Sequence, residues 1–219
     1  MPDFDPTTLD IARRYKLLIG TIVPRPIALV STVSTQGRTN LAPFSFFAGV
    51  GSNPMTLLFC PATNADGTDK DTLRNAAPTS EGGVGQFVVN VATEHYAAKV
   101  AAAAEELPFG ESEFDLVGLT PETATKVRPP RVKESPVCFE CETVQVIRTN
   151  AGAPSSGNIV LGRVVWARVH DDVVDGRLRI APSQLKAIGR MAGLTYCTTR
   201  ERFDLPWGRA ALEIECPFK

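Results

Sequence analysis

Histidine, excess charge and long apolar runs are all scarce in this chain of 219 residues. Its two histidines, His95 and His170, are too few for a His-based metal site or a nucleophile paired with its base. The 23 Lys and Arg nearly balance the 24 Asp and Glu, so there is no field for a nucleic-acid backbone. No signal peptide opens the chain, and no apolar run approaches the ~20 residues that span a bilayer. We expect a soluble, cytoplasmic protein with no metal, nucleic-acid or membrane partner.

A disulfide framework and a dinucleotide-binding glycine motif are also missing. The five cysteines, an odd set without framework spacing, are typical of reduced thiols: Cys60, Cys138, Cys141, Cys197 and Cys216. Cys138 and Cys141 form a C-x-x-C, but they lie in an expected strand at 136–147, where residues three apart face opposite sides. A redox or metal role for this pair is therefore the less favoured interpretation. No G-x-G-x-x-G follows a strand, which argues against a Rossmann domain.

Strand patterns dominate what is present. The β-branched run at 26–33 and the turn residues at 34–40 predict a hairpin, with a return strand at 41–47. Pro43 interrupts that strand and requires an edge position or a bulge. Further strands are expected at 55–60, 85–91, 136–147 and 158–170, with a bulge or bend at Gly162. We therefore expect a single domain over 1–219, mainly β, folded as an antiparallel, Greek-key-like barrel with a few helices.

Three helices are expected among these strands. Asp71 is the expected cap of a helix at 72–76, and Thr93 that of an alanine-rich helix at 94–106. A short helix is expected at 182–191, ending at Gly193. The segments 64–69, 128–136 and 150–156 are expected to be loops. In the second of these we interpret the basic residues as solvated: Arg128, Arg131 and Lys133.

The segment from Arg25 to Phe47 resembles the flavin reductase-like family of FMN-binding split barrels. The matching residues are RPIALVST at 25–32, Gly37, and NLAPFSFF at 40–47. Weaker matches follow in the family's order at 70–75, 87–90, 159–164 and 188–196. The resemblance covers about residues 20–205. It implies the split-barrel fold, bound FMN (FAD less so), and a homodimer with the flavin near its interface.

The residue types in this segment suit a flavin. A flavin needs short polar donors beside apolar walls. The donors are Ser31, Thr32, Asn40 and Ser45, the walls are Phe46 and Phe47, and Ala42 lies between them. The alternative is an exposed polar hairpin next to two core phenylalanines.

Lys70, Asp71 and Thr72 would begin a helix, where free N–H groups and the dipole favour an anion. The resemblance places the flavin phosphate near them. The alternative is that Asp71 is only a helix cap and Lys70 only a solvated charge. Arg25 is a further phosphate candidate, or else an exposed strand-entry residue. Asn90, Arg190 and Tyr196 are candidates for substrate or interface contact, with a core role as the alternative for Tyr196.

No side chain is expected to be catalytic, because flavin itself carries out hydride and electron transfer. The resemblance implies an NAD(P)H:flavin reductase in which NAD(P)H gives a hydride to the flavin N5. The acceptor is then free flavin, a partner monooxygenase, a metal chelate or oxygen. Two alternatives remain open: an FMN-binding electron carrier without NAD(P)H turnover, and a flavin-free ligand-binding barrel.

Overall fold

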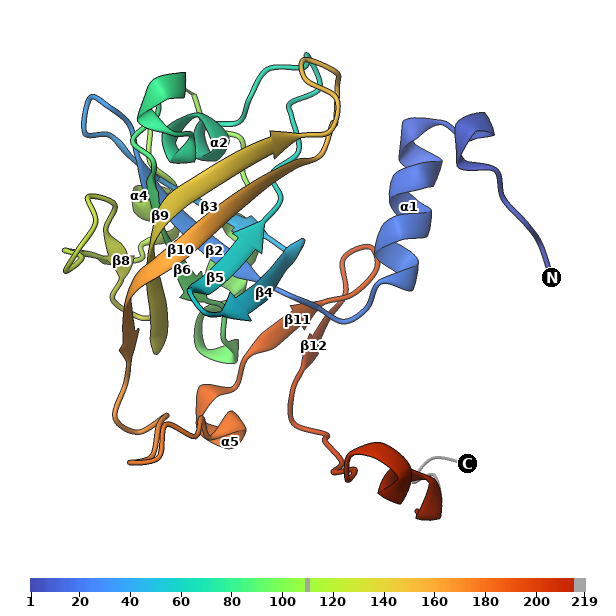
Figure 1. Ribbon diagram of the computed structural model, residues 1–219. Coiled ribbons are helices and arrows are strands. Elements are labelled where there is room, and N and C mark those ends of the chain that lie inside the picture. Colours follow the sequence, from blue (N-terminus) through green and yellow to red (C-terminus); the bar gives the residue numbers. More distant parts are fainter. Residues whose placement is uncertain (109–110, 215–219) are drawn as a thin grey trace.

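The computed structural model describes residues 1–108 and 111–214, and its main feature is an antiparallel sheet curled into a barrel (Figure 1). The strand order is β3-β2-β6-β9-β10-β5-β4. The strands are β2 (Ala28–Val33), β3 (Thr39–Phe44), β4 (Phe47–Ser52), β5 (Met55–Phe59), β6 (Gln86–Val91), β9 (Val137–Arg148) and β10 (Asn158–Val169). The expected mainly-β, antiparallel barrel with few helices is confirmed.

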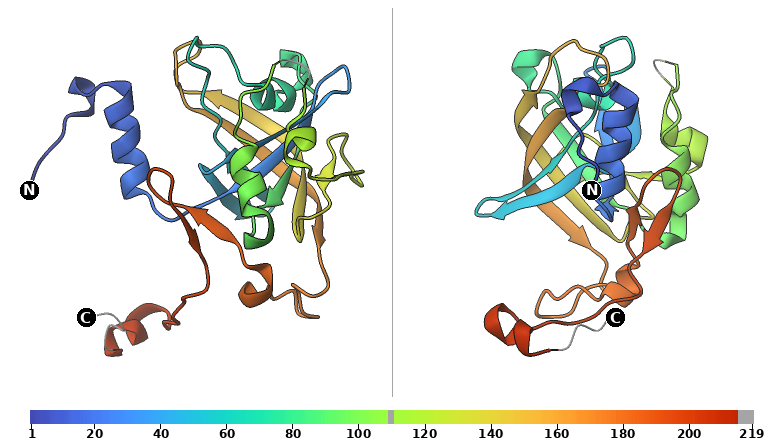
Figure 2. Two further views of the ribbon diagram at one scale, coloured as in Figure 1. Left: turned by 180° about the vertical axis from the view of Figure 1, so that it is seen from behind. Right: turned by 90° about the vertical axis from the view of Figure 1, so that its right-hand side faces the viewer.

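Smaller elements surround this barrel. A three-stranded sheet joins β1 (Arg25–Pro26), β11 (Ile188–Arg190) and β12 (Tyr196–Thr198), and β7 (Pro121–Glu122) pairs with β8 (Arg131–Val132). The helices are α1 (Ile11–Thr21), α2 (Asp71–Ala76), α3 (Ala97–Ala102), α4 (Glu113–Val117) and α5 (Pro182–Leu185). Short 3-10 turns are η1 (Pro6–Thr8), η2 (Thr79–Glu81), η3 (Glu94–Tyr96) and η4 (Gly208–Glu213). The views in Figures 1 and 2 place α1 away from the barrel, and none of its residues is buried.

Aromatic side chains fill the barrel. The ring of Phe59 lies edge-on to Phe87 at 5.0 Å and packs against Phe44 at 5.1 Å. Gly162 makes room for this cluster, because a Cβ at that position would lie 2.3 Å from the Phe87 ring. The pairing of β10 with β9 shifts register between Leu161 and Gly162. The bulge expected at Gly162 is therefore confirmed.

The strand β3 is an edge of the main sheet, as Pro43 requires. Leu41 lies two residues before Pro43, so its backbone N–H points in the same direction as an N–H at position 43 would. This N–H donates at 2.8 Å to the Glu113 carboxylate and not to a neighbouring strand. The N–H that Pro43 lacks would also point away from β2. Glu113 of α4 thus covers the outer edge of β3, and burial raises the pKa of its carboxyl above the ordinary value.

Three of the helix predictions need correction. Asp71 is not the cap of α2: Lys70 takes that position, and the Asp71 carboxylate pairs with Arg74 one turn later. The helix expected at 94–106 is a 3-10 turn followed by six helical residues, because Tyr96 leaves helical geometry to bond the Val91 carbonyl. The helix expected at 182–191 ends at Leu185, and 188–190 form β11 instead.

The two C-x-x-C residues separate as the strand pattern predicts. Cys138 packs against Val88 and Val127, whereas Cys141 faces the barrel core with Phe87. Burial raises the pKa of both thiols, that of Cys138 to about 11. Cys60, Cys138, Cys141 and Cys197 are all free thiols, and Cys216 lies outside the described residues.

Candidate functional site

One group of expected site residues meets where α2 packs on the hairpin of β2 and β3. The Asn40 amide donates a hydrogen bond at 2.9 Å to the Thr72 hydroxyl, and the Asn75 amide donates one at 3.1 Å to the Thr32 hydroxyl. Thr32 and Thr72 are buried, at 0% and 1% exposure. A hydroxyl that accepts a bond keeps its own proton to donate. Both hydroxyls are therefore oriented by amides, and neither is an exposed polar group of a bare hairpin.

Lys70 and Asp71 lie at the rim of this group. Both side chains are half-buried, and the Lys70 ammonium contacts Glu106 at 3.4 Å. The Asp71 carboxylate forms an ion pair with Arg74. It therefore repels an anion at Lys70 less than an unpaired carboxylate would. Because α2 has only six residues, we attribute any attraction for an anion here to the Lys70 charge rather than to the helix dipole.

A second group gathers around Arg25. Its Nε donates to the Ser45 hydroxyl at 3.2 Å, and its guanidinium lies 5.8 Å from the centre of the Phe46 ring. Its other nitrogens bond the carbonyls of Ile19, Ile22 and Met191. Arg25 is 3% exposed, and burial lowers the pKa of its guanidinium. It therefore orients Ser45 and the end of α1, and it is neither an exposed entry residue nor a free cation for phosphate.

The strip from Ala42 to Phe47 connects the two groups. All six residues are half-buried, whereas every residue of the neighbouring strand β2 is buried. Phe47 packs toward the barrel core, while Phe46 lies beside Arg25. This strip therefore offers short polar and aromatic side chains at an accessible surface, held at one end by Asn40–Thr72 and at the other by Arg25–Ser45.

Arg190 and Tyr196 face each other across β11 and β12, with the guanidinium 4.4 Å from the ring centre. Arg190 also pairs in register with Arg25 of β1. Both side chains remain half-buried, so Tyr196 is not a fully buried core residue. This pair adjoins the Arg25 group and not the α2 group.

Ser31 and Asn90 lie on the face of the sheet opposite Thr32 and Asn40, beneath the 128–136 segment. The Ser31 hydroxyl donates to the Pro130 carbonyl, and the Asn90 amide donates to the carbonyl of Leu29 at 3.0 Å. The Asn90 oxygen accepts the Val132 N–H at 2.8 Å. Both side chains are 0% exposed. They tie the 128–136 segment to the sheet, and in this structure neither reaches the surface that a ligand would contact.

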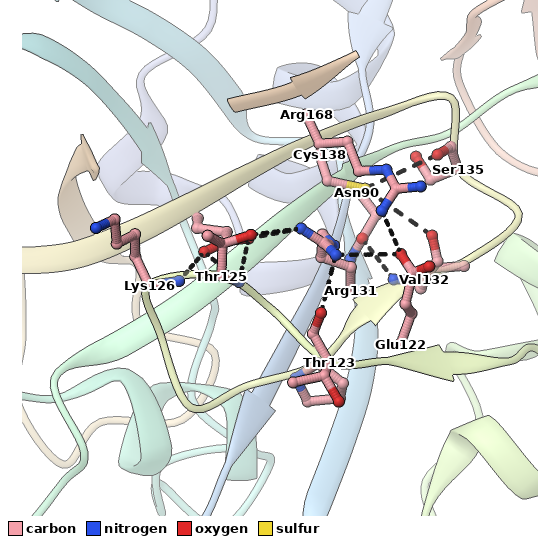
Figure 3. A network of polar contacts seen from close by, with 12 residues as sticks. Asn90, Glu122, Thr123, Thr125, Lys126, Arg131, Val132, Ser135, Cys138 and Arg168 are labelled. Carbon is pink, nitrogen blue, oxygen red and sulfur yellow. Dashed lines mark hydrogen bonds and ion pairs between the residues drawn. The ribbon is translucent and has the colours of Figure 1, made fainter. Parts of the chain in front are cut away.

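That segment also holds a buried ion pair (Figure 3), which corrects the expectation of a solvated side chain for Arg131, whereas Arg128 and Lys133 are exposed as expected. Arg131 donates at 3.0 Å to Glu140, which is 0% exposed and also accepts the N–H groups of Thr125 and Lys126. Glu122 lies 3.3 Å from Arg131 and 3.0 Å from Arg168. A buried charge needs such partners. The network is structural, since it anchors 121–132 against β9.

Sequence reasoning missed two residues that shape the site. Asn75 orients Thr32, and it ends the matched segment 70–75, so its place there was a usable signal. Glu113 supports β3 from 72 residues away, and no local pattern marks it. Among the described residues, no group of three or more His, Cys, Asp or Glu is arranged to hold a metal ion. Likewise, no helix in the described part is long and apolar enough to cross a membrane.

The fold and this strip define a split-barrel protein, and comparison with known proteins identifies its family. The family model described as "Flavin reductase like domain" matches residues 19–200. The chain therefore belongs to the flavin reductase-like family.

Solved structures and relatives agree with this family. Nitrilotriacetate monooxygenase component B from Bacillus cereus is 35% identical with a TM-score of 0.86, covering 94% of this chain and 98% of that chain. The 2-nitrobenzoate 2-nitroreductase NbaA of Pseudomonas fluorescens is 27% identical with a TM-score of 0.82, covering 95% and 97%. A protein of Aquifex aeolicus is 37% identical over 182 residues, covering 83% of this chain and 88% of that protein.

Proposed function

We propose that this chain is an FMN-dependent oxidoreductase of the NAD(P)H:flavin reductase type, with the flavin held along the strip from Ala42 to Phe47. The observation that carries the proposal is the half-buried strip itself, fixed by a hydrogen bond at each end. Flavin sites need this combination of short donors and an aromatic wall on a rigid support.

The residues present fit FMN. Lys70 supplies the cation for a phosphate, and the buried Thr72 and Thr32, held by Asn40 and Asn75, support the α2 end from beneath. Asn40 to Phe44 is four residue steps of β3, or about 14 Å along an extended strand, and Ser45 follows directly. That span suits an elongated mononucleotide with its charged end at α2 and its ring toward Phe46. We propose that Ser31 and Asn90 act by supporting the sheet rather than by contact.

The bound flavin supplies hydride and electron transfer, which this chain's side chains need not perform. The side chains bind and orient. Arg25 fixes the Ser45 hydroxyl, Phe46 forms an apolar wall, and Asn40 holds Thr72. Arg190 and Tyr196 lie beside this end and are placed to contact a nicotinamide donor or a second subunit.

The electron acceptor is proposed from likeness. One similar structure is a monooxygenase component B, and 35% identity over nearly the whole chain favours the same kind of partnership here. We therefore propose oxidised free flavin as the first acceptor to test, ahead of oxygen or a metal chelate. Once reduced, this flavin would carry the electrons to a partner monooxygenase.

A homodimer is proposed as the working assembly. Exposed side chains of α1 and of the Ile22 that caps it form an apolar stripe at helical spacing: Ile11, Tyr15, Leu18 and Ile22, each 45–56% exposed. Figures 1 and 2 show most of the helix standing clear of the barrel. A second copy would cover this stripe, and Arg25 joins α1 to the strip through the Ile19 and Ile22 carbonyls. Light scattering of the Tyr15→Asp/Leu18→Asp variant should then show a monomer where the wild type shows a dimer.

Three measurements on purified protein test the function. An absorption spectrum with mass analysis of the released cofactor should identify FMN, and added FMN should sustain steady consumption of NADH or NADPH. FMN at ~100 times its dissociation constant should also stabilise the fold by about 2.7 kcal/mol. Bound flavin without NAD(P)H consumption would indicate an electron carrier instead. A colourless protein whose melting temperature FMN leaves unchanged would indicate a flavin-free barrel.

A further inference from the structure

A cavity of about 200 Å³ lies beside α5, at the end of the β11–β12 hairpin opposite its turn. It is lined by Pro182, Ser183, Lys186, Thr199, Arg200 and Arg202. Three of these side chains are cationic and two carry hydroxyls. Among the described residues that line it, none is acidic.

The charges converge because of how the chain turns here. Lys186 ends α5 with a left-handed backbone (φ 49°), and its carbonyl accepts the Glu94 N–H at 3.0 Å. Arg200 and Arg202 follow directly after β12, and Arg202 bonds the Thr199 carbonyl. The Glu94 carboxylate pairs with Arg200 and balances one of the three cations. Lys186 and Arg202 therefore leave the cavity with an excess of positive charge.

The β11–β12 hairpin connects this cavity with the proposed flavin site. Lys186 lies four residues before Arg190, and Arg200 lies four after Tyr196, so the cavity is about 13 Å from the Arg190–Tyr196 pair by strand geometry. Arg190 is paired with Arg25, which bonds Ser45 of the strip. One extended dinucleotide is long enough to have one end beside this pair and the other in the cavity.

We propose that this cavity binds the phosphate monoester on the adenosine ribose of NADPH, and that Lys186 and Arg202 make the chain prefer NADPH over NADH. Cationic side chains with nearby hydroxyls are the usual partners of a phosphate dianion. NADH carries a neutral 2′-hydroxyl at that position and gains no such ion pairs. The proposal rests on the proposed function, because it names which of the two donors the reductase uses.

The first test compares steady-state oxidation of NADPH and NADH, with saturating FMN, by wild type and Lys186→Gln/Arg202→Gln. We expect the NADPH/NADH ratio of kcat/KM to fall about tenfold, the scale of two partly exposed ion pairs, while kcat/KM for NADH stays within about twofold. Arg163→Ala, which removes an exposed arginine on β10, should leave the ratio unchanged. An unchanged ratio in the double variant, with both donors oxidised, would overturn the assignment.

The second test does not depend on activity, so it separates failure of this assignment from failure of the reductase function. In calorimetry at low salt, adenosine 2′,5′-bisphosphate should bind wild type more tightly than 5′-AMP or inorganic phosphate. The double variant should lose that preference. Equal binding of all three, or a preference that the double variant keeps, would show that the cavity does not recognise the ribose phosphate.

Discussion

Asn40 and Thr72 lie 32 residues apart in the sequence, and the Asn40 amide donates a 2.9 Å hydrogen bond to the Thr72 hydroxyl within the protein interior. This bond ties the edge strand β3 to the start of α2, and it joins two of the segments that carry the family resemblance. It also fixes the direction of the Thr72 hydroxyl, which remains able to donate. The structure therefore brings the two segments together.

Asn40→Ala should weaken FMN binding. Loss of one buried hydrogen bond to an otherwise unsatisfied group costs about 1–2 kcal/mol, which corresponds to a rise of roughly tenfold in the dissociation constant if that bond organises the site. Flavin fluorescence titration measures it. Asn64→Ala is the matched control, because Asn64 makes a similar bond to Thr68 in an exposed loop. Equal affinities for the two variants would argue against the site.

Glu140→Ala should destabilise the protein strongly. Removal of this fully buried carboxylate leaves Arg131 without its buried partner, which costs about 3–5 kcal/mol. Glu142→Ala, two residues along the same strand, breaks an exposed pair with Arg163 and should cost less than about 1 kcal/mol. Urea denaturation gives both values. Similar losses in the two variants would show that the Glu140 network is not buried as described.

Gly162→Ala should also destabilise the barrel, because the new methyl group would lie 2.3 Å from the Phe87 ring. Overpacking of this kind costs about 1–3 kcal/mol. Gly162→Ala combined with Phe87→Leu should recover part of that loss. Thermal unfolding compares the two with Gly49→Ala, at a site where a methyl group meets open space. A neutral Gly162→Ala would contradict the close approach.

Glu113 predicts a specific pH dependence of stability. Burial raises the pKa of its carboxyl above the ordinary 4.5, so between that value and the folded pKa the native state holds more protons than the unfolded chain. Stability from this group is then full below pH 4.5 and falls as pH rises through the folded pKa. Gln at this position still accepts the Leu41 N–H and does not titrate. The melting temperature of wild type should therefore fall relative to Glu113→Gln as pH rises from 4, and a constant difference would contradict the raised pKa.

The strands were predictable because their signal is local. The apolar, β-branched run at 26–33 and the bulge or bend at Gly162 both follow from neighbouring residues, and Pro43 restricts β3 to an edge position or a bulge. The start of a helix at Lys70–Thr72 was predictable in the same way, while a phosphate site there stays a prediction. Asp71 was misread because Lys70 begins the helix and Arg74 captures the carboxylate.

The sequence predicted poorly those residues whose burial or secondary structure depends on a partner elsewhere in the chain. Arg131 is buried because Glu140 lies inside a strand nine residues later, and an acidic residue in that apolar run was the available signal. The segment 188–190 is a strand because β1, far earlier in the chain, pairs with it. Ser31 looked like its neighbour Thr32, but alternate strand residues face opposite sides, and only Thr32 lies on the α2 side.

The most direct test of the flavin site is the dissociation constant of FMN, measured by fluorescence titration of the cofactor-free protein as wild type, Lys70→Ala, Ser45→Ala and Arg163→Ala. The site described here predicts about tenfold weaker binding for Lys70→Ala, from loss of the cation facing the phosphate, and clearly weaker binding for Ser45→Ala. Arg163→Ala should bind FMN as wild type does. Wild-type affinity in both Lys70→Ala and Ser45→Ala would contradict the placement of the flavin along this strip.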